Sequence, residues 1–238
     1  MKLTVLGKYG PYPKAGGATT SYLVECCGKK ILLDAGSGSL SRVQQYCSLD
    51  DLDMIILTHL HSDHCADMFV LRYAPLKHPV PVYLPATPAW EHDTLCACER
   101  FKASNITEGL ELAFPALKVS ISFCQTLHPV ECYAVKFRAE GKSFVFSGDS
   151  RYSDHLAGFC RDADVVMLDS GFLNEDHPQK ILPHMTVGEA AQTAKTARAG
   201  KLFLTHINPT YCEQDLLREA CAIFQDTIIV QEKTEYII

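Results

Sequence analysis

Four side chains that can bind a metal ion lie within six residues of this chain, at His59, His61, Asp63 and His64. The apolar run Met54–Leu57 precedes them and predicts a buried β-strand. Because alternate residues leaving a strand point to the same side, we expect His59 and His61 to face one point. Asp63 and His64 begin the next predicted helix and can reach a second point nearby. Imidazole and carboxylate ligands suit zinc, manganese or iron, so this segment indicates a metal centre.

The pattern of these four residues resembles a known family signature. His-x-His-x-Asp-His is similar to the signature motif of the metallo-β-lactamase superfamily, and the resemblance extends along nearly the whole chain. Asp34, in Leu-Leu-Asp-Ala-Gly, matches the first motif of that family. The resemblance implies that the Asp34 carboxylate supports the metal-binding loop from behind the ligands.

The family pattern continues with a lone His, an Asp that bridges two metals and a final His, each at a strand end. His128, Asp149 and His206 match these positions, and each follows an apolar stretch. Any one alone would more often be a capping or core residue, but their shared order favours the match. The resemblance implies two divalent ions, one bound by His59, His61 and His128 and the other by Asp63, His64 and His206, with Asp149 bridging both. Zinc is the first expectation, with manganese and iron as alternatives.

A second motif, His184-x-Thr186 before a predicted helix, is similar to that of the ribonuclease Z branch of the superfamily. In that branch a Glu pairs with this His, and here Asp169, one methylene shorter, occupies the position. The resemblance implies that a metal-bridging hydroxide attacks phosphorus and that Asp63 orients it and accepts its proton. His184 would bind the phosphate or protonate the leaving oxygen. We therefore expect three catalytic residues, Asp63, His184 and Asp169. The alternative is that His184 only caps the following helix.

The segment between His128 and Asp149 departs from ribonuclease Z. Those enzymes carry there a long glycine-rich, basic arm that grips transfer RNA, whereas this chain has room for only two strands and a turn at Gly141-Lys142. The chain has 22 Lys and Arg against 28 Asp and Glu, a net charge of −6. A protein that binds long nucleic acids usually has a basic surplus. We therefore expect a small anionic substrate and no extended nucleic-acid partner.

These observations favour a dinuclear metal-dependent hydrolase of small phosphodiesters, such as a cyclic nucleotide or a short oligonucleotide. Two other enzymatic functions stay open. One is a ribonuclease Z-type endonuclease acting at the 3′ end of transfer RNA, and the other is a hydrolase of esters, thioesters or lactones using the same metals. A non-enzymatic metal-binding scaffold is disfavoured because all seven ligand positions are intact. β-Lactam hydrolysis is disfavoured because zinc β-lactamases are secreted and their second metal site has a different ligand pattern.

Short β-rich runs alternate with helical patterns along the chain. Met54–Leu57 and Val165–Leu168 are fully apolar, which predicts strands buried on both faces and helices outside the sheets. We expect an α/β protein with the four-layer αββα metallo-β-lactamase fold, in which two stacked mixed β-sheets are flanked by helices. Thr186 and Glu189 predict a capping box for the helix Val187–Ala199, and Gly200 marks its expected end. The stretch Cys96–Pro115 is predicted to be a surface excursion.

The other predicted elements can be listed by residue range. The strands are Leu3–Leu6, Ser21–Glu25, Lys30–Leu33, Val80–Leu84, Lys118–Phe123, Tyr133–Arg138, Ser143–Ser147, Lys201–Leu204, Thr227–Gln231 and Glu235–Ile238. The helices are Leu40–Tyr46, Asp63–Tyr73, Pro88–Cys98, Tyr152–Cys160 and Glu213–Phe224.

We expect residues 1–238 to form a single domain, because no linker or low-complexity segment divides them. The N-terminal segment lacks the pattern of a secretory signal, and no apolar run approaches the roughly 18–20 residues that cross a bilayer. The eleven cysteines show no framework of paired spacings, which indicates reduced thiols in a cytoplasmic protein. The family resemblance implies a homodimer.

Overall fold

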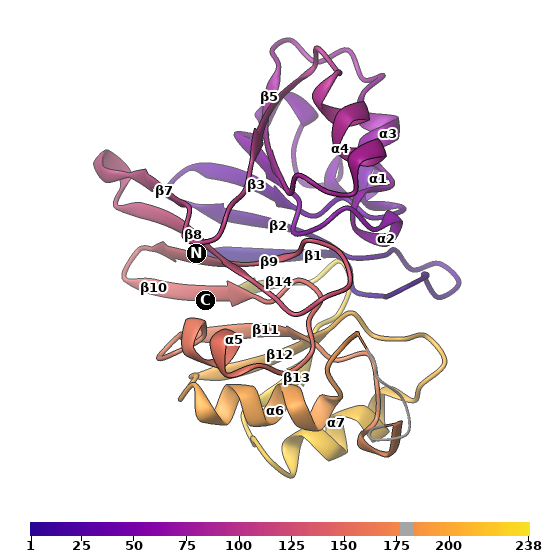
Figure 1. Ribbon diagram of the computed structural model, residues 1–238, viewed down its shortest axis with the longest axis vertical. Coiled ribbons are helices and arrows are strands. Elements are labelled where there is room, and N and C mark those ends of the chain that lie inside the picture. The colour runs from indigo at the N-terminus through magenta and orange to yellow at the C-terminus, as the bar shows by residue number, and fades with distance from the viewer. Residues whose placement is uncertain (177–182) are drawn as a thin grey trace.

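A computed structural model describes residues 1–176 and 183–238 of the chain. Two seven-stranded β-sheets pack face to face, and helices cover the outer face of each sheet (Figure 1). The strand order is β14-β1-β2-β3-β4-β5-β6 in the first sheet and β13-β12-β11-β10-β9-β8-β7 in the second. The layers have the predicted order of helix, sheet, sheet and helix, so the αββα fold class is confirmed.

The strands are short, as their alternation with turns predicts. The first sheet contains β1 (Lys2–Gly7), β2 (Ser21–Cys26), β3 (Lys29–Leu33), β4 (Met54–Ile56), β5 (Val80–Leu84), β6 (Phe101–Asn105) and β14 (Glu235–Ile237). The second sheet contains β7 (Glu111–Phe114), β8 (Val119–Gln125), β9 (Tyr133–Ala139), β10 (Lys142–Phe146), β11 (Val165–Asp169), β12 (Lys201–Thr205) and β13 (Thr227–Ile229).

The helices are divided between the two outer faces. The first sheet is covered by α1 (Ser39–Val43), α2 (Ser62–Cys65), α3 (Met68–Leu71) and α4 (Ala89–Cys96), and the second by α5 (Asp154–Phe159), α6 (Val187–Thr196) and α7 (Glu213–Cys221) (Figure 1). Single 3₁₀ turns lie at Leu49–Asp51, Pro115–Leu117 and Asn174–Asp176. Among the described residues, no helix is both long and apolar enough to cross a membrane.

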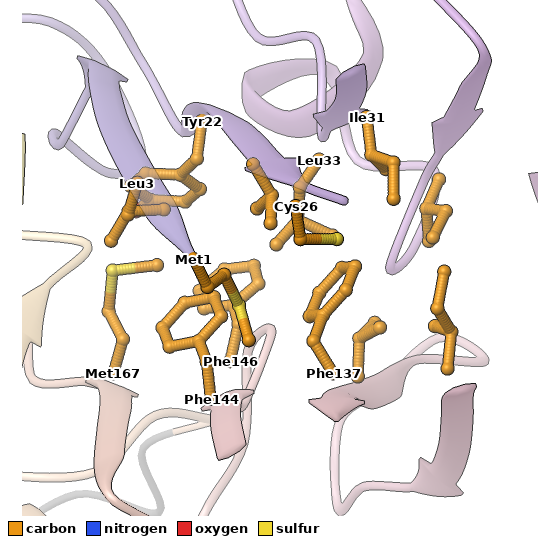
Figure 2. Packing of buried hydrophobic residues seen from close by; sticks show 14 of the residues in the cluster. Met1, Leu3, Tyr22, Cys26, Ile31, Leu33, Phe137, Phe144, Phe146 and Met167 are labelled. Atoms are coloured by element: carbon orange, nitrogen blue, oxygen red, sulfur yellow. The ribbon is translucent and has the colours of Figure 1, made fainter. Parts of the chain in front are cut away.

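Strands β4 and β11 are buried on both faces, as their unbroken apolar sequences predict. In β4, Met54 and Ile56 belong to the core between the sheets, whereas Ile55 packs with the residues under the outer helices. In β11, Val165 belongs to the core between the sheets and Val166 to the core beneath α5–α7. Figure 2 shows side chains of the two sheets meeting in the central core, among them Met1, Leu3, Tyr22, Phe137, Phe144, Phe146 and Met167.

The carboxyl ends of several strands open on one edge of the sandwich. Strands β3, β4, β5 and β6 run parallel to one another, as do β10, β11, β12 and β13. Strand β8 runs in the same direction as β10, because both pair with β9 in antiparallel fashion. Loops that leave such strands are the usual positions of functional residues in α/β proteins. The predicted ligands all come directly after these strands.

Two predictions of secondary structure are wrong. The stretch Cys96–Pro115 is not a surface excursion, because it contains β6 and β7, the edge strands of the two sheets. Both strands are half exposed, so their sequences lack the apolar signal of the central strands. The predicted helix Asp63–Tyr73 is two short helices, α2 and α3. At the break, the Asp67 carboxylate accepts a hydrogen bond from the backbone N–H of Leu40 (2.7 Å). The backbone N–H of Asp67 donates to the backbone oxygen of Ala35.

The predicted capping box of α6 is confirmed, but the role of Gly200 differs. The Thr186 hydroxyl accepts a hydrogen bond from the N–H of Glu189, whose side chain accepts one from the N–H of Thr186. Helix α6 ends at Thr196, before the predicted end at Ala199, and Arg198 takes the left-handed backbone conformation after it. Gly200 is needed for close packing instead, because a Cβ atom there would lie 2.6 Å from the backbone oxygen of Asp164.

The packing of the central core leads to a stability prediction. Phe144 is fully buried and its ring lies 5.9 Å from that of Phe137. Replacing Phe144 with Ala should therefore lower the free energy of unfolding by about 3–5 kcal/mol. Urea unfolding followed by circular dichroism measures the change. The matched control is Tyr73→Ala, since Tyr73 is 78% exposed, and equal losses in the two variants would contradict the assigned core.

Candidate metal centre

The first predicted ligand group is assembled from both sheets. His59 and His61 leave β4 of the first sheet, and His128 comes after β8 of the second. The His61 Nδ1 atom lies 3.1 Å from Nε2 of His59 and 3.1 Å from Nε2 of His128. Ligand atoms roughly 2.0–2.3 Å from a zinc ion stand about 3.3–3.8 Å apart in a tetrahedral site. The three imidazoles therefore converge as ligands of one cation would.

The second predicted group also joins the two sheets. Asp63 and His64 belong to α2, and His206 comes after β12. Asp63 Oδ2 lies 3.1 Å from His206 Nε2 and 3.7 Å from His64 Nε2. His206 has a backbone φ of 55°, in the left-handed region that non-glycine residues rarely adopt. Such backbone strain is common at functional sites.

Asp149 lies between the two groups. It comes after β10 and is buried, with Oδ1 3.2 Å from His64 Nε2 and Oδ2 3.4 Å from His206 Nε2. Its Oδ2 atom is also 3.5 Å from His59 Nε2, in the other group. Gly148 immediately before it has a φ of 58°, which turns the chain so that the carboxylate faces inward. One carboxylate thus reaches both groups, as the predicted bridging position requires.

The chemistry of these donors fits divalent cations. Within the described part of the chain, His64 Nε2 and Asp149 Oδ1 are buried and make no hydrogen bond, although buried polar atoms are nearly always satisfied. Burial opposes the charging of His64, but the carboxylates of Asp149, Asp63 and Asp34 outweigh it and raise its pKa to about 10. The pocket therefore stabilises positive charge strongly. Bound cations would supply that charge and engage the unsatisfied atoms.

Asp34 holds the ligand loop from behind, in the position that the sequence predicts. Its Oδ1 accepts a hydrogen bond from the N–H of Thr58 (2.7 Å), and its Oδ2 accepts one from the Thr58 hydroxyl (2.9 Å). His64 Nδ1 donates to the same Oδ2 (2.8 Å). This bond leaves His64 Nε2 directed at Asp149. Contacts of this kind fix the orientation of metal-binding imidazoles.

His184 and Asp169 lie together beside the two groups. His184 Nδ1 donates to Asp169 Oδ2 (2.8 Å), so the shorter acidic side chain still reaches the histidine. The His184 ring stacks on that of His206, with centroids 4.9 Å apart and an 18° angle between the planes. Burial would lower the pKa of His184, but the neighbouring Asp169 carboxylate outweighs it and raises the pKa. His184 does not cap α6, because Thr186 does.

Sequence reasoning missed the contact between Gly10 and the metal centre. A Cβ atom at Gly10 would lie 2.0 Å from His206 Nε2, so only glycine allows this loop to pass the imidazole. The Gly10 N–H donates to the backbone oxygen of Ile207 (3.2 Å) and fixes the loop beside β12. The sequence shows only a Gly-Pro pair far from the ligand motifs. No local pattern relates it to a histidine near the other end of the chain.

The fold and this arrangement of histidines and aspartates are those of a known class of metallo-hydrolase. A family model described as "Beta-lactamase superfamily domain" matches residues 29–207. The chain therefore belongs to the β-lactamase superfamily, as the signature motif predicts. The groups His59-His61-His128-Asp149 and Asp63-His64-His206 are each close enough to hold a metal ion. Which residue binds which metal stays a prediction.

Similar proteins agree with this assignment. The chain is 32% identical to the probable metallo-hydrolase YhfI of Bacillus subtilis over 241 residues, covering 96% of each chain. The crystal structure of YhfI superposes with a TM-score of 0.91 at 30% identity, over 99% of this chain and 98% of that one. A ribonuclease Z of Archaeoglobus fulgidus is 26% identical over 97% of this chain and 95% of its own.

A solved structure with lower sequence identity shares the fold. The short form of human tRNase Z has a TM-score of 0.78 at 18% identity, over 100% of this chain and 99% of its own. The predicted resemblance to the ribonuclease Z branch is confirmed by the relative from Archaeoglobus fulgidus, whereas the human structure shows a common fold. Between His128 and Asp149 the chain has β9 and β10 joined at Glu140-Gly141, so the predicted pair of strands stands in place of an arm.

The central position of Asp149 leads to a prediction about metal binding. Because its two oxygens reach both ligand groups, Asp149→Ala should lose two equivalents of bound metal relative to the unaltered protein. His61→Ala should lose one, since His61 contacts only the first group. Elemental analysis after dialysis against limiting zinc measures both losses. Asp162→Ala changes an exposed acid and serves as the control; an Asp149 variant that keeps its full metal content would refute the shared position.

Proposed function

We propose that this chain is a dinuclear metal-dependent hydrolase that cleaves small phosphodiesters, such as a cyclic nucleotide or a short oligonucleotide. Two zinc ions are the expected cofactors. The proposal rests chiefly on His184. Its imidazole lies outside the two predicted ligand groups, and Asp169 holds it beside them. A phosphodiester with a poor leaving group depends on such a proton donor more strongly than a thioester or an activated ester does.

The two ligand groups would hold two divalent cations, which would supply an activated water and neutralise the charge of a phosphate. Asp63 accepts the proton of the attacking water, because its carboxylate belongs to the second ligand group and its side chain keeps 11% of its surface exposed. This small exposure lets the proton pass to solvent. Asp63 thus combines ligand and base roles at one position.

His184 protonates the departing oxygen. Its Nδ1 atom is committed to Asp169, and Nε2 makes no hydrogen bond to any described residue, so Nε2 is free to face a substrate. The side chain is 14% exposed, so solvent and a substrate can reach it. Asp169 also accepts a hydrogen bond from the N–H of Ser150 (3.1 Å) and lies 3.5 Å from His206 Nδ1. It therefore positions His184 against the ligand cluster.

Two features of the chain and the name of one relative support a small phosphodiester as the substrate. The relative from Archaeoglobus fulgidus is named a ribonuclease, and RNA is a phosphodiester polymer. Its name therefore supports a phosphodiester as the bond that is cleaved. The chain has only a turn between β9 and β10, and its net charge is −6. Both features disfavour an extended polyanion. We therefore propose a small anionic phosphodiester.

A leaving-group series tests the role of His184. His184→Ala should lower kcat by about 10²–10⁴-fold for a cyclic nucleotide, whose alkoxide needs a proton. The loss should be much smaller for bis(p-nitrophenyl) phosphate, because p-nitrophenolate departs without one. His92→Ala, outside the site, is the matched control. Equal losses on both substrates would show that His184 only binds phosphate, and activity confined to a thioester would overturn the proposed function.

The role of Asp63 gives a separate expectation. Asp63→Ala should abolish turnover of both phosphodiesters while the thermal unfolding temperature stays close to that of the unaltered protein, since Asp63 lies at the surface of the site and not in the core. Steady-state kinetics and calorimetry on one preparation measure the two properties. Turnover at the unaltered rate would exclude Asp63 from the reaction.

A further inference from the structure

A second cluster of side chains that could hold a metal ion lies apart from the ligand groups described above. Its three members come from separate segments: Glu108 from the turn between β6 and β7, Cys124 from β8 and His155 from α5. One ligand atom of each lies within 4.8 Å of the other two. The predicted centre contains only histidines and aspartates, so a thiol distinguishes this cluster from it chemically.

The spacing of two of the donors matches a tetrahedral site, and the Cys124 Sγ atom lies within 4.8 Å of both. His155 Nε2 lies 3.3 Å from Glu108 Oε1. This is the separation expected for nitrogen and oxygen ligands bound to one zinc ion at roughly 2.0–2.1 Å. A simple ion pair between these two exposed side chains would account for that distance, but it would not require a buried thiol beside them. Cys124 is only 2% exposed.

The surrounding contacts orient the donors. Glu108 Oε2 accepts a hydrogen bond from the N–H of Gln125, which leaves Oε1 for His155 and the thiol. Among the described residues, the Cys124 thiol makes one weak hydrogen bond, donating to the backbone oxygen of Gln125 at 3.7 Å. Carboxylates held in this way by a second hydrogen bond are typical of metal sites. The three side chains are thus oriented so that one metal ion could bind between them.

We propose that Glu108, Cys124 and His155 bind a third, thiophilic divalent cation, zinc in the first place, with a fourth coordination position open to solvent. Sulfur, imidazole and carboxylate together are ligands that zinc accepts and magnesium or calcium does not. The cation would join the turn before β7 to helix α5. It would therefore brace β8, which leads to His128, and the segment that comes after Asp149.

The state of the thiol has a consequence for binding. Burial, with the nearby Glu108 carboxylate, raises the pKa of Cys124 to about 12, against the opposing effect of Lys136. The thiol is therefore protonated in the absence of metal, and a bound cation must displace its proton.

Cobalt substitution tests the proposal directly, because a cobalt–thiolate bond gives a charge-transfer absorption in the near ultraviolet that His and Asp ligands do not give. Titration of the full-length metal-free protein with Co²⁺ should develop this band to a limit of one equivalent. Cys124→Ser should abolish it, and His155→Ala should weaken binding without unfolding the protein, since His155 is exposed. After dialysis against limiting zinc, both variants should hold one metal fewer than the unaltered protein.

The exposed cysteines provide the controls. Cys96 lies 3.4 Å from His92 Nε2 and could bind cobalt by itself, so Cys96→Ser and Cys212→Ser should both keep the band. A band that survives in Cys124→Ser and disappears in Cys96→Ser would overturn the proposal. So would the absence of any thiolate band, which would leave Glu108 and His155 as an ion pair. Circular dichroism of each variant separates loss of binding from loss of fold.

Discussion

Buried charge is the constraint on which the rest of this structure depends. Asp34, Asp63 and Asp149 lie together with several imidazoles at the edge of the sandwich, where removal from water costs several kcal/mol per ion unless opposite charge and hydrogen bonds compensate. The protein arranges that compensation in layers. Backbone and hydroxyl donors of Thr58 satisfy Asp34, imidazoles surround Asp149, and the remaining unsatisfied atoms point inward. A cation at the centre would complete an arrangement that the protein atoms alone leave unbalanced.

Much of this could be predicted from the sequence, because the ligands are tied to strands with strong local signals. The apolar runs that form β4 and β11 are typical of central strands, and the residues directly after a central parallel strand lie at its carboxyl end. The spacing of His59, His61, Asp63 and His64 then predicts a shared centre. The capping box at Thr186 fixes the start of α6 and hence the place of His184. In each case a short segment contains both the element and its functional residue.

The features that could not be predicted depend on contacts between distant segments. Strands β6 and β7 are edge strands with one exposed face, so their sequences resemble loops, and only pairing with β5 and β8 makes them strands. The break between α2 and α3 depends on Asp67 binding the backbone of α1. Gly10 is required only because His206 passes beside it. The proposed cluster of Glu108, Cys124 and His155 joins three elements that carry no common motif.

Each predicted ligand group takes members from both sheets, and this has a consequence for cooperativity. A cation bound there is a cross-link between the N-terminal and C-terminal halves of the sandwich, since neither half holds a complete set. Metal affinity and the packing of the two sheets against each other must therefore be thermodynamically linked. A change that destabilises the packing of the sheets weakens metal binding by the same free energy, and metal binding stabilises the packing in return. The metal centre is thus complete only when the two halves are assembled, and neither half alone could bind both metals.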